Sequence, residues 1–210
     1  MTDIAYEVEI RFRAATATEA YAILPFLEAS LGAEKAWTTD ILSPVIYGAG
    51  QLLRVGRVPP TGDTRYYLGY KDVDQGTVAN IRREWGEEIT QGSNHSAILA
   101  AVGISGQFDS AAAVLAALDA AGHQPFMSFS GVDRLGYVAE LDVHTKLMHC
   151  PKILGEGVMV ELEMAAASYE AALVAEAQLQ SLAAKYKLSD RLIHDEPPTL
   201  LYRVTHPTAS

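Results

Sequence analysis

The sequence contains a single cysteine, Cys150, so the chain cannot form an internal disulfide bond. Proteins without disulfides are typical of reducing compartments, and we therefore expect a cytoplasmic protein. The N-terminus lacks the basic start and the apolar core of a secretory signal peptide. No stretch approaches the about 20 apolar residues that a transmembrane helix requires, so we expect no membrane partner.

Positive charge is also scarce in this chain. It has 16 Lys and Arg residues against 26 Asp and Glu residues, which gives a formal net charge of -10. Nucleic acids and anionic membranes require a basic surface, so the charge argues against both as partners. A small polyanion remains compatible if the few cations gather in one place together with a divalent metal. The sequence has no Gly-rich phosphate loop of the Walker type.

The pattern of apolar residues predicts an α+β protein. With 210 residues, 49% hydrophobic and 20% charged, we expect a single domain over 1–210, in which roughly the last six residues form a frayed tail. Helical spacing favours helices over 18–31, 109–121 and 168–187, with a kink at Pro25, and a short helix near 198–204. Alternation predicts strands over 4–13, 37–42, 51–58, 65–73, 80–89, 126–131, 134–148 and 157–166. Short turns between these strands favour an antiparallel sheet or barrel.

The first predicted strand has one charged face and one apolar face. Alternate side chains of a strand share a face. One face therefore carries Glu7, Glu9, Arg11 and Arg13, and the other carries Val8, Ile10 and Phe12. A strand of this kind cannot be buried in an apolar core on both sides. The charged face meets either bulk water or a wet cavity.

Later strands repeat this pattern. Charged side chains that share a face are Arg65 with Lys71, Arg82 with Glu84, Glu140 with Asp142, and Glu161 with Glu163, while Arg54 stands among apolar neighbours. An antiparallel sheet with one solvated face produces such alternation in any single strand. Taken together, the paired acids near the two ends of the chain and the cations in the middle favour a metal–polyphosphate ligand. Carboxylates suit Mg²⁺ or Mn²⁺, and Arg side chains suit phosphate oxygens.

The order of these motifs resembles the CYTH superfamily, also called the triphosphate tunnel metalloenzymes. The opening Glu7-Val-Glu9-Ile-Arg11 is similar to the family's Glu-x-Glu-x-Lys signature. Further similarities, in chain order, are Leu53-Arg54, Arg65 through Lys71, Arg82-x-Glu84, Arg134, and Leu154-Gly155 followed by Glu161-x-Glu163. The resemblance extends from about residue 4 to 203, and it depends on the order and spacing of motifs that are individually short.

The resemblance implies an antiparallel eight-stranded β-barrel that forms a tunnel, with helices packed on its outside. Carried over by position, the metal-side candidates are Glu7, Glu9, Asp142, Glu161 and Glu163, and the phosphate-side candidates are Arg11, Arg54, Arg65, Lys71, Arg82 and Arg134. Among these, Glu9, Arg11 and Glu163 are the expected catalytic residues. Mg²⁺ or Mn²⁺ is the implied cofactor, and a homodimer is left open.

The chain departs from the family pattern at three positions. Arg11 stands where the family usually has Lys, and an Arg cannot give up its proton. Val132 stands where a second cation often precedes Arg134. The acidic residue of the family's seventh strand has two candidates. Asp142 fits the local strand pattern and is favoured, whereas counting back from Leu154-Gly155 points to His149.

The resemblance implies a metal-dependent hydrolase of inorganic triphosphate, thiamine triphosphate or a nucleoside triphosphate. A class IV adenylyl cyclase and a non-catalytic triphosphate binder are the alternatives, since cyclisation of ATP uses much the same groups as hydrolysis. The absence of the His-Phe pair that such cyclases often carry before the first signature Glu favours hydrolysis. The cluster His144, His149 and Cys150 is poor evidence for zinc, and we expect His194-Asp195-Glu196 to be a solvated loop.

Overall fold

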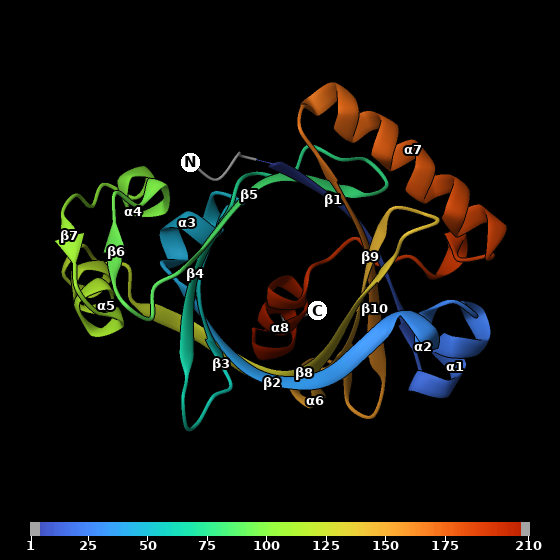
Figure 1. Ribbon diagram of the computed structural model, residues 1–210, viewed down its shortest axis with the longest axis horizontal. Helices are drawn as coiled ribbons and strands as arrows, with labels where there is room; N and C mark the ends of the chain where they lie inside the picture. The colour runs from blue at the N-terminus through green and yellow to red at the C-terminus, as the bar shows by residue number, and fades with distance from the viewer. Residues whose placement is uncertain (1–4, 207–210) are drawn as a thin grey trace. The chain divides into compact units, whose positions relative to one another are not determined.

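The computed structural model describes residues 5–206 (Figure 1). Its strands are β1 Ala5–Ala14, β2 Leu31–Leu42, β3 Leu52–Val58, β4 Arg65–Lys71, β5 Asn80–Glu88, β6 Ser93–Asn94, β7 Gln107–Phe108, β8 Pro125–Val138, β9 Val143–His149 and β10 Val158–Ala166. Its α-helices are α1 Ala17–Ile23, α2 Leu27–Ser30, α3 Pro44–Gly48, α4 Ala97–Ala101, α5 Ala111–Ala120, α6 Pro151–Leu154, α7 Tyr169–Lys185 and α8 Pro197–Thr205, with a 3₁₀ turn at Ser189–Arg191. The expected start of the first strand at Ile4 and the last residues of the expected tail lie outside the described residues.

The eight longer strands form one closed antiparallel sheet, in the order β1-β10-β9-β8-β2-β3-β4-β5. Helices α1 and α7 pack against β1 and β10 on the outside of this sheet (Figure 1). The short strands β6 and β7 pair separately. The predicted α+β class with an eight-stranded closed sheet is therefore confirmed. Within residues 5–206, no helix combines the length and the apolar character needed to cross a membrane.

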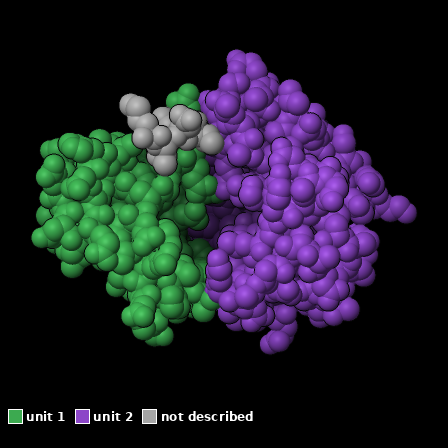
Figure 2. All heavy atoms as spheres, viewed as in Figure 1, with its two compact units in different colours: residues 1–4, 36–74, 83–130 green, residues 5–35, 75–82, 131–210 purple. Residues whose placement is uncertain are grey.

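The chain divides into two compact units, which Figure 2 colours separately. Among the described residues, unit 1 contains 36–74 and 83–130, and unit 2 contains 5–35, 75–82 and 131–206. Each unit is built from segments that are far apart in the sequence. The expectation of a single domain over 1–210 stays a prediction.

The core of unit 2 explains why β1 has one apolar face. Val8, Ile10 and Phe12 are almost completely buried, and they belong to a cluster with Leu27 of α2 and Leu179 of α7. Helix α7 lies along β1 and β10, as Figure 1 shows. Because alternate residues of β1 face this core, the charged residues between them must point to the other face of the sheet.

The core of unit 1 lies under two short helices. Leu53 of β3 and Leu68 of β4 are fully buried and cluster with Leu99 of α4 and with Val114 and Leu118 of α5. Helix α5 begins at Ala111, two residues after the predicted start, because the Ser110 hydroxyl caps it by accepting a hydrogen bond from the Ala113 amide. Helices α3 and α4 and the pair β6–β7 were not predicted, because each is too short to show a period.

The predicted helix over 18–31 is two helices. Helix α1 ends at Ile23, α2 starts at Leu27, and Pro25 lies between them, because a proline cannot donate the backbone hydrogen bond that a continuous helix needs. The N-cap of α1 is Thr16, whose hydroxyl accepts a hydrogen bond from the Glu19 amide at 3.1 Å. Strand β2 then follows directly from Leu31, earlier than expected.

The two predicted strands over 126–131 and 134–148 are divided differently in the structure. Strand β8 continues through the expected break, and the turn lies at 139–142, inside the second predicted strand. Asp142 has a positive φ of 52° in this turn, a conformation that Asp tolerates better than most residues. The alternation of apolar residues could not predict this turn, because Val138 and Val143 on either side of it continue the strand-like pattern.

Candidate functional site

The charged faces of β1 and β10 meet in unit 2. In the antiparallel register, Glu9 is opposite Glu163 and Arg11 is opposite Glu161. Residues that are directly opposite each other share a face of the sheet, so these four side chains lie on the face turned away from the apolar core. Glu9 is 3% exposed and Arg11 is 1% exposed. The two acidic motifs, which lie near opposite ends of the sequence, are therefore neighbours in the structure.

Arg11 is the centre of this neighbourhood. Its guanidinium pairs with Glu9, and its Nε lies 3.7 Å from Glu161 Oε1. Its Nη1 donates hydrogen bonds to Asn80 Oδ1 at 2.5 Å and to the His194 carbonyl at 2.9 Å. Burial by itself lowers the pKa of Arg11, but the neighbouring carboxylates outweigh that effect and raise the pKa. Arg11 is therefore a permanent cation.

Further charged residues extend the network, which we call the Arg11 cluster. It consists of Glu9, Arg11, Asn80, Arg82, Asp133, Lys146, Glu161 and Glu196, all in unit 2. Arg82 was predicted as a phosphate ligand, and its Nη1 lies 3.1 Å from Glu196 Oε2. The cluster therefore holds two of the six predicted phosphate-side residues and two of the five predicted metal-side residues.

Glu196 was wrongly expected in a solvated loop. It is 6% exposed, and its Oε1 lies 4.0 Å from the Arg11 guanidinium. The segment before it is held against β1, since the Ile193 amide donates to the Arg11 carbonyl at 2.8 Å and Leu192 forms a bridge with Phe12. The residues around Glu196 do not predict its burial beside Arg11, because the two residues are far apart in the sequence.

Lys146 and Asp133 were also missed by sequence reasoning. Lys146 is opposite Glu161 in the β9–β10 register, and its Nζ lies 3.0 Å from Glu161 Oε2 and 3.6 Å from Asp133 Oδ2. His144 is opposite Glu163 one row further along. The alternation of β9 places His144 and Lys146 on one face of the strand. Only the register with β10 shows that this face also carries Glu161 and Glu163.

A second charged group lies in unit 1, which we call the Glu84 trio: Arg54, Lys71 and Glu84. The Arg54 Nη2 lies 2.6 Å from Glu84 Oε1, and the Lys71 Nζ lies 3.5 Å from Glu84 Oε2. Arg54 crosses β4 at Gly69, where a Cβ atom would lie 2.9 Å from Arg54 Nε. The structure thus brings two predicted phosphate-side residues together on one carboxylate.

Two other predicted phosphate ligands are placed differently. The Arg65 side chain is 66% exposed, and its Nη1 lies 3.8 Å from Glu88 Oε2, so its phosphate role stays a prediction. Arg134 has other partners in the structure, and its phosphate role stays a prediction. Its guanidinium donates to the Tyr21 hydroxyl and to the Gly32 carbonyl, both at 2.9 Å, and so holds the segment after α1. Because Asp133 joins the Arg11 cluster, its neighbour Arg134 points to the opposite face.

Neither candidate for the seventh-strand acid lies in the Arg11 cluster. Asp142 is exposed in the β8–β9 turn and accepts a hydrogen bond from the Tyr137 hydroxyl at 2.6 Å, which raises the pKa of Tyr137. His149 belongs to the alternate set of β9 side chains from His144 and Lys146, so it points to the other face. The favoured metal role of Asp142 does not follow from its position.

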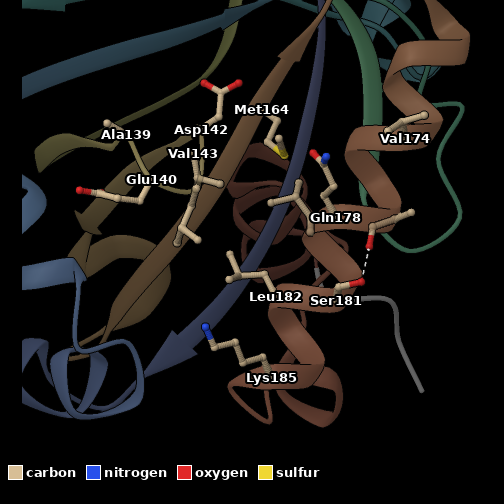
Figure 3. Close-up of a pocket in the computed structure, with 13 residues that line it drawn as sticks. Ala139, Glu140, Asp142, Val143, Met164, Val174, Gln178, Ser181, Leu182 and Lys185 are labelled. Atoms are coloured by element: carbon tan, nitrogen blue, oxygen red, sulfur yellow. Dashed lines mark hydrogen bonds between the residues drawn. The ribbon is translucent and has the colours of Figure 1, made fainter.

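Asp142 instead lines a groove of about 650 Å³ on the α7 side of unit 2 (Figure 3). The groove runs between the β8–β9 turn and one side of α7, with Lys185 at one end of the view. Its lining contains no other residue predicted for the site. Since α7 packs on the apolar face of β1 and β10, the groove is separate from the charged face.

The carboxylates that β1 and β10 place opposite each other suit a divalent ion that is also bound by a substrate. Among residues 5–206, no three His, Cys, Asp or Glu side chains form a group that could hold a metal ion alone. Glu9 and Glu163 nevertheless stand directly opposite each other, and half-buried Glu7 precedes them on the same face. Mg²⁺ typically keeps several waters and takes one or two carboxylates together with substrate phosphates. The two opposed carboxylates suit that mode of binding.

Comparisons with known proteins gave structural matches. No family model matches the sequence, and no curated protein matches it. The PH1819 protein from Pyrococcus horikoshii aligns with a TM-score of 0.69 at 17% identity, covering 94% of this chain and 99% of that one. A proposed adenylate cyclase from Vibrio parahaemolyticus aligns with a TM-score of 0.66 at 15% identity, covering 93% and 97%.

A third match is a proposed adenylyl cyclase from Hippeastrum, for which a dominant triphosphatase activity is described. It aligns with a TM-score of 0.59 at 12% identity, covering 96% of each chain. At these identities the likeness is one of fold. Together with the closed antiparallel sheet, it confirms the fold that the resemblance implies, which this chain shares with these proposed adenylate cyclases.

Proposed function

We propose that this protein is a divalent-metal-dependent hydrolase of a triphosphate-containing small molecule. The observation that carries the proposal is the row of β1 and β10, where the buried pair Glu9 and Arg11 faces Glu163 and Glu161. Carboxylates for a metal and a guanidinium for phosphate are thereby neighbours in a place shielded from water. The activities described for the structural neighbours are compatible with this assignment.

In the proposed reaction, basic side chains would compensate the negative charge of the bound phosphates. Buried phosphate charge requires compensation, and Arg side chains provide it through charge-assisted hydrogen bonds. Arg11 and Arg82 are the candidates in unit 2. Arg54 and Lys71 form a separate candidate pair in unit 1. Because its pKa is raised, Arg11 acts as a fixed charge that stabilises the leaving phosphate rather than as a proton donor.

The carboxylates have the complementary task. Glu9 and Glu163 would hold the divalent ion or accept a proton from the attacking water. A bound divalent ion would offset charge on the phosphate oxygens and lower the pKa of a coordinated water. Attack of water on a phosphorus atom would break one phosphoanhydride bond, pass a proton to a carboxylate and release two phosphate products. Attack by a ribose hydroxyl of ATP would instead give cyclic AMP and pyrophosphate.

The product distinguishes these reactions. We would incubate the full chain with inorganic triphosphate, thiamine triphosphate or ATP, each with Mg²⁺ or Mn²⁺, and measure both phosphate and cyclic AMP. We expect phosphate release that requires the metal. Cyclic AMP with pyrophosphate would support the cyclase alternative, and triphosphate binding without turnover would support the non-catalytic binder.

The matched variants are Glu9→Gln and Glu28→Gln. Glu28 is exposed on α2, so the same chemical change there should leave activity unchanged. Glu9→Gln should lower the rate by about 100-fold or more, because a carboxylate that would hold the metal or accept the proton of the attacking water is lost. Equal activity of the two variants would contradict the proposed site, and the absence of product from all substrates would contradict the proposed function.

A further inference from the structure

An exposed aromatic pair lies on the charged face of unit 2. Tyr137 of β8 is directly opposite His144 of β9, and their ring centroids are 4.8 Å apart with the ring planes inclined by 42°. His144 is in turn opposite Glu163 of β10, which is opposite Glu9 of β1. Directly opposite residues share a face of the sheet, so these four side chains form one row across four neighbouring strands. The aromatic pair therefore lies beside the carboxylates of the proposed site.

Both rings of this pair are open to solvent. Tyr137 is 47% exposed, His144 is exposed, and Leu135, the next residue on the same face of β8, is 48% exposed. By contrast, the alternate residues Val143 and Thr145 of β9 are buried on the other face. Single exposed apolar side chains are ordinary, but here two rings and a leucine adjoin one another within a charged face. Apolar surface combined with a few polar groups is the composition of a small-molecule site.

The tyrosine ring is already held in place. Its hydroxyl donates a hydrogen bond of 2.6 Å to Asp142 in the turn between β8 and β9, and its backbone belongs to the closed sheet. A side chain that is fixed before binding loses little conformational entropy when a ligand contacts it. Because the hydroxyl is engaged with Asp142, the part of Tyr137 that remains for a ligand is the face of the ring.

We propose that Tyr137 and His144 bind a planar heteroaromatic ring of the substrate. The preferred substrate is then a triphosphate ester that carries such a ring, a nucleoside triphosphate or thiamine triphosphate, rather than inorganic triphosphate. The inference rests on the proposed function for the position of the phosphate chain beside Glu9 and Arg11. Neighbouring strands are about 4.8 Å apart, so the three strand spacings from β1 to β8 place the pair about 14 Å from that position along the sheet. A triphosphate chain and the linker to its ring span a distance of this order.

The physical contribution of the pair is stacking. Stacking of a base on an aromatic side chain typically strengthens binding by about tenfold or more, and it tolerates different bases because each has a π face. Offset or tilted rings are also the favoured geometries for aromatic contacts. The pair therefore distinguishes a ligand with a ring from one without, and it distinguishes different rings less strongly.

The test compares two analogues in which imido groups replace both bridging oxygens of the triphosphate, so that neither is hydrolysed. One is the analogue of ATP, and the other is the analogue of inorganic triphosphate. Calorimetry of the full chain with Mg²⁺ should show that the ATP analogue binds at least about tenfold more tightly. Tyr137→Leu should remove most of this preference and leave the affinity for the ringless analogue unchanged. Tyr137→Phe should keep the preference, because it keeps the ring.

His144→Leu tests the second ring independently and should also reduce the preference, and thermal unfolding checks that each variant folds. Tyr47→Leu is the matched control, because it makes the same change in α3 of unit 1, where the ring contacts Phe126. It should keep the full preference. Steady-state rates with ATP and with thiamine triphosphate identify which ring is used: Tyr137→Leu should raise the KM of that substrate and change kcat little.

Equal binding of the two analogues by the wild type would overturn the inference and leave the proposed function standing. An unchanged preference in folded Tyr137→Leu and His144→Leu would do the same. A preference for the ATP analogue without hydrolysis of any triphosphate would contradict the proposed function alone. Failure of both analogues to bind would overturn both proposals.

Discussion

Arg11 illustrates how a single buried charge is tolerated. Removing an ion from water is unfavourable unless partners replace the water. The guanidinium has Glu9 beside it, Asn80 and the His194 carbonyl as acceptors, and two further carboxylates within 4.0 Å. An arginine suits this position better than a lysine, because its planar fork can reach several acceptors at once and stays charged.

The close approach of Arg54 to Gly69 gives a prediction at the same scale. In Gly69→Ala, the new Cβ would lie 2.9 Å from Arg54 Nε and 3.1 Å from its Cγ, so the arginine must swing away from Glu84. The backbone needs no change, because Gly69 has no positive φ. We expect the affinity for inorganic triphosphate to fall about tenfold, or about 1.4 kcal/mol, measured by calorimetry.

The matched control is Gly86→Ala. Gly86 is directly opposite Gly69 on β5, and a Cβ there would meet nothing within 4 Å. It should leave the affinity unchanged. If both variants bind triphosphate like the wild type, the position of Arg54 has no part in binding.

At the scale of elements, the segment between the 3₁₀ turn and α8 acts as part of the site. It brings Glu196 to Arg11 and Arg82, the two candidate phosphate ligands of unit 2. A carboxylate in this position competes with phosphate oxygens for the same donors. The position of this segment therefore depends on the attraction between Glu196 and the two arginines of the Arg11 cluster.

Glu196→Gln tests that competition. The neutral amide keeps the shape of the side chain but attracts the two guanidiniums less strongly, so we expect triphosphate to bind about three- to tenfold more tightly. Calorimetry with inorganic triphosphate provides the measurement. Asp190→Gln, an exposed change in the 3₁₀ turn, is the control. Weaker binding in Glu196→Gln would mean that the carboxylate positions the arginines instead of competing for them.

Helix α7 gives a second prediction at this scale. The buried Glu176 side chain accepts hydrogen bonds from the amides of Thr77, Val78 and Ala79, at 3.3, 3.0 and 3.0 Å. Burial raises the pKa of Glu176, but these three hydrogen bonds outweigh it and lower the pKa. A lowered folded-state pKa means that this stabilisation is present above the unfolded value of about 4.3 and is lost as the pH falls through the folded value.

Glu176→Gln should therefore lower the free energy of unfolding by about 1–2 kcal/mol at neutral pH and by less at acidic pH. Denaturant unfolding at several pH values measures the difference, and hydrogen exchange should show faster exchange at 77–79. Glu28→Gln is again the control, since its carboxylate is exposed. An equal loss of stability at pH 7 and pH 3 would show that the carboxylate charge is not responsible.

At the scale of the whole molecule, the formal net charge of -10 restricts the partners. The cations that could bind phosphate are engaged with carboxylates, as in the Arg11 cluster and the Glu84 trio. A long polyanion would meet the excess negative charge of the remaining surface, whereas a short one would not.

We therefore expect no binding of single-stranded or double-stranded nucleic acid at physiological salt, measured by fluorescence anisotropy with labelled oligonucleotides. Inorganic triphosphate in the same buffer, with Mg²⁺, should bind and serves as the positive control. Salt-dependent binding of the oligonucleotides at micromolar concentration would contradict this restriction.

Much of this architecture follows from local patterns. The alternation of Glu7, Glu9 and Arg11 with Val8 and Ile10 predicted a strand with one charged face, which the structure confirms. The break near Pro25 and the helices at 111–120 and 169–185 follow from proline chemistry, serine caps and helical spacing. These features depend on residues close together in the chain, so the sequence can express them.

The sequence by itself determined which residues are charged, which of them share a strand face and which side of β1 must be buried, because these are consequences of backbone geometry. Only the tertiary structure decided that Lys146 stands beside Glu161, that Glu196 reaches Arg11, and that Arg134 turns to Tyr21. Those outcomes depend on strand register and on contacts between distant segments. A shift of one residue in register reverses every side chain, and no local pattern encodes that choice.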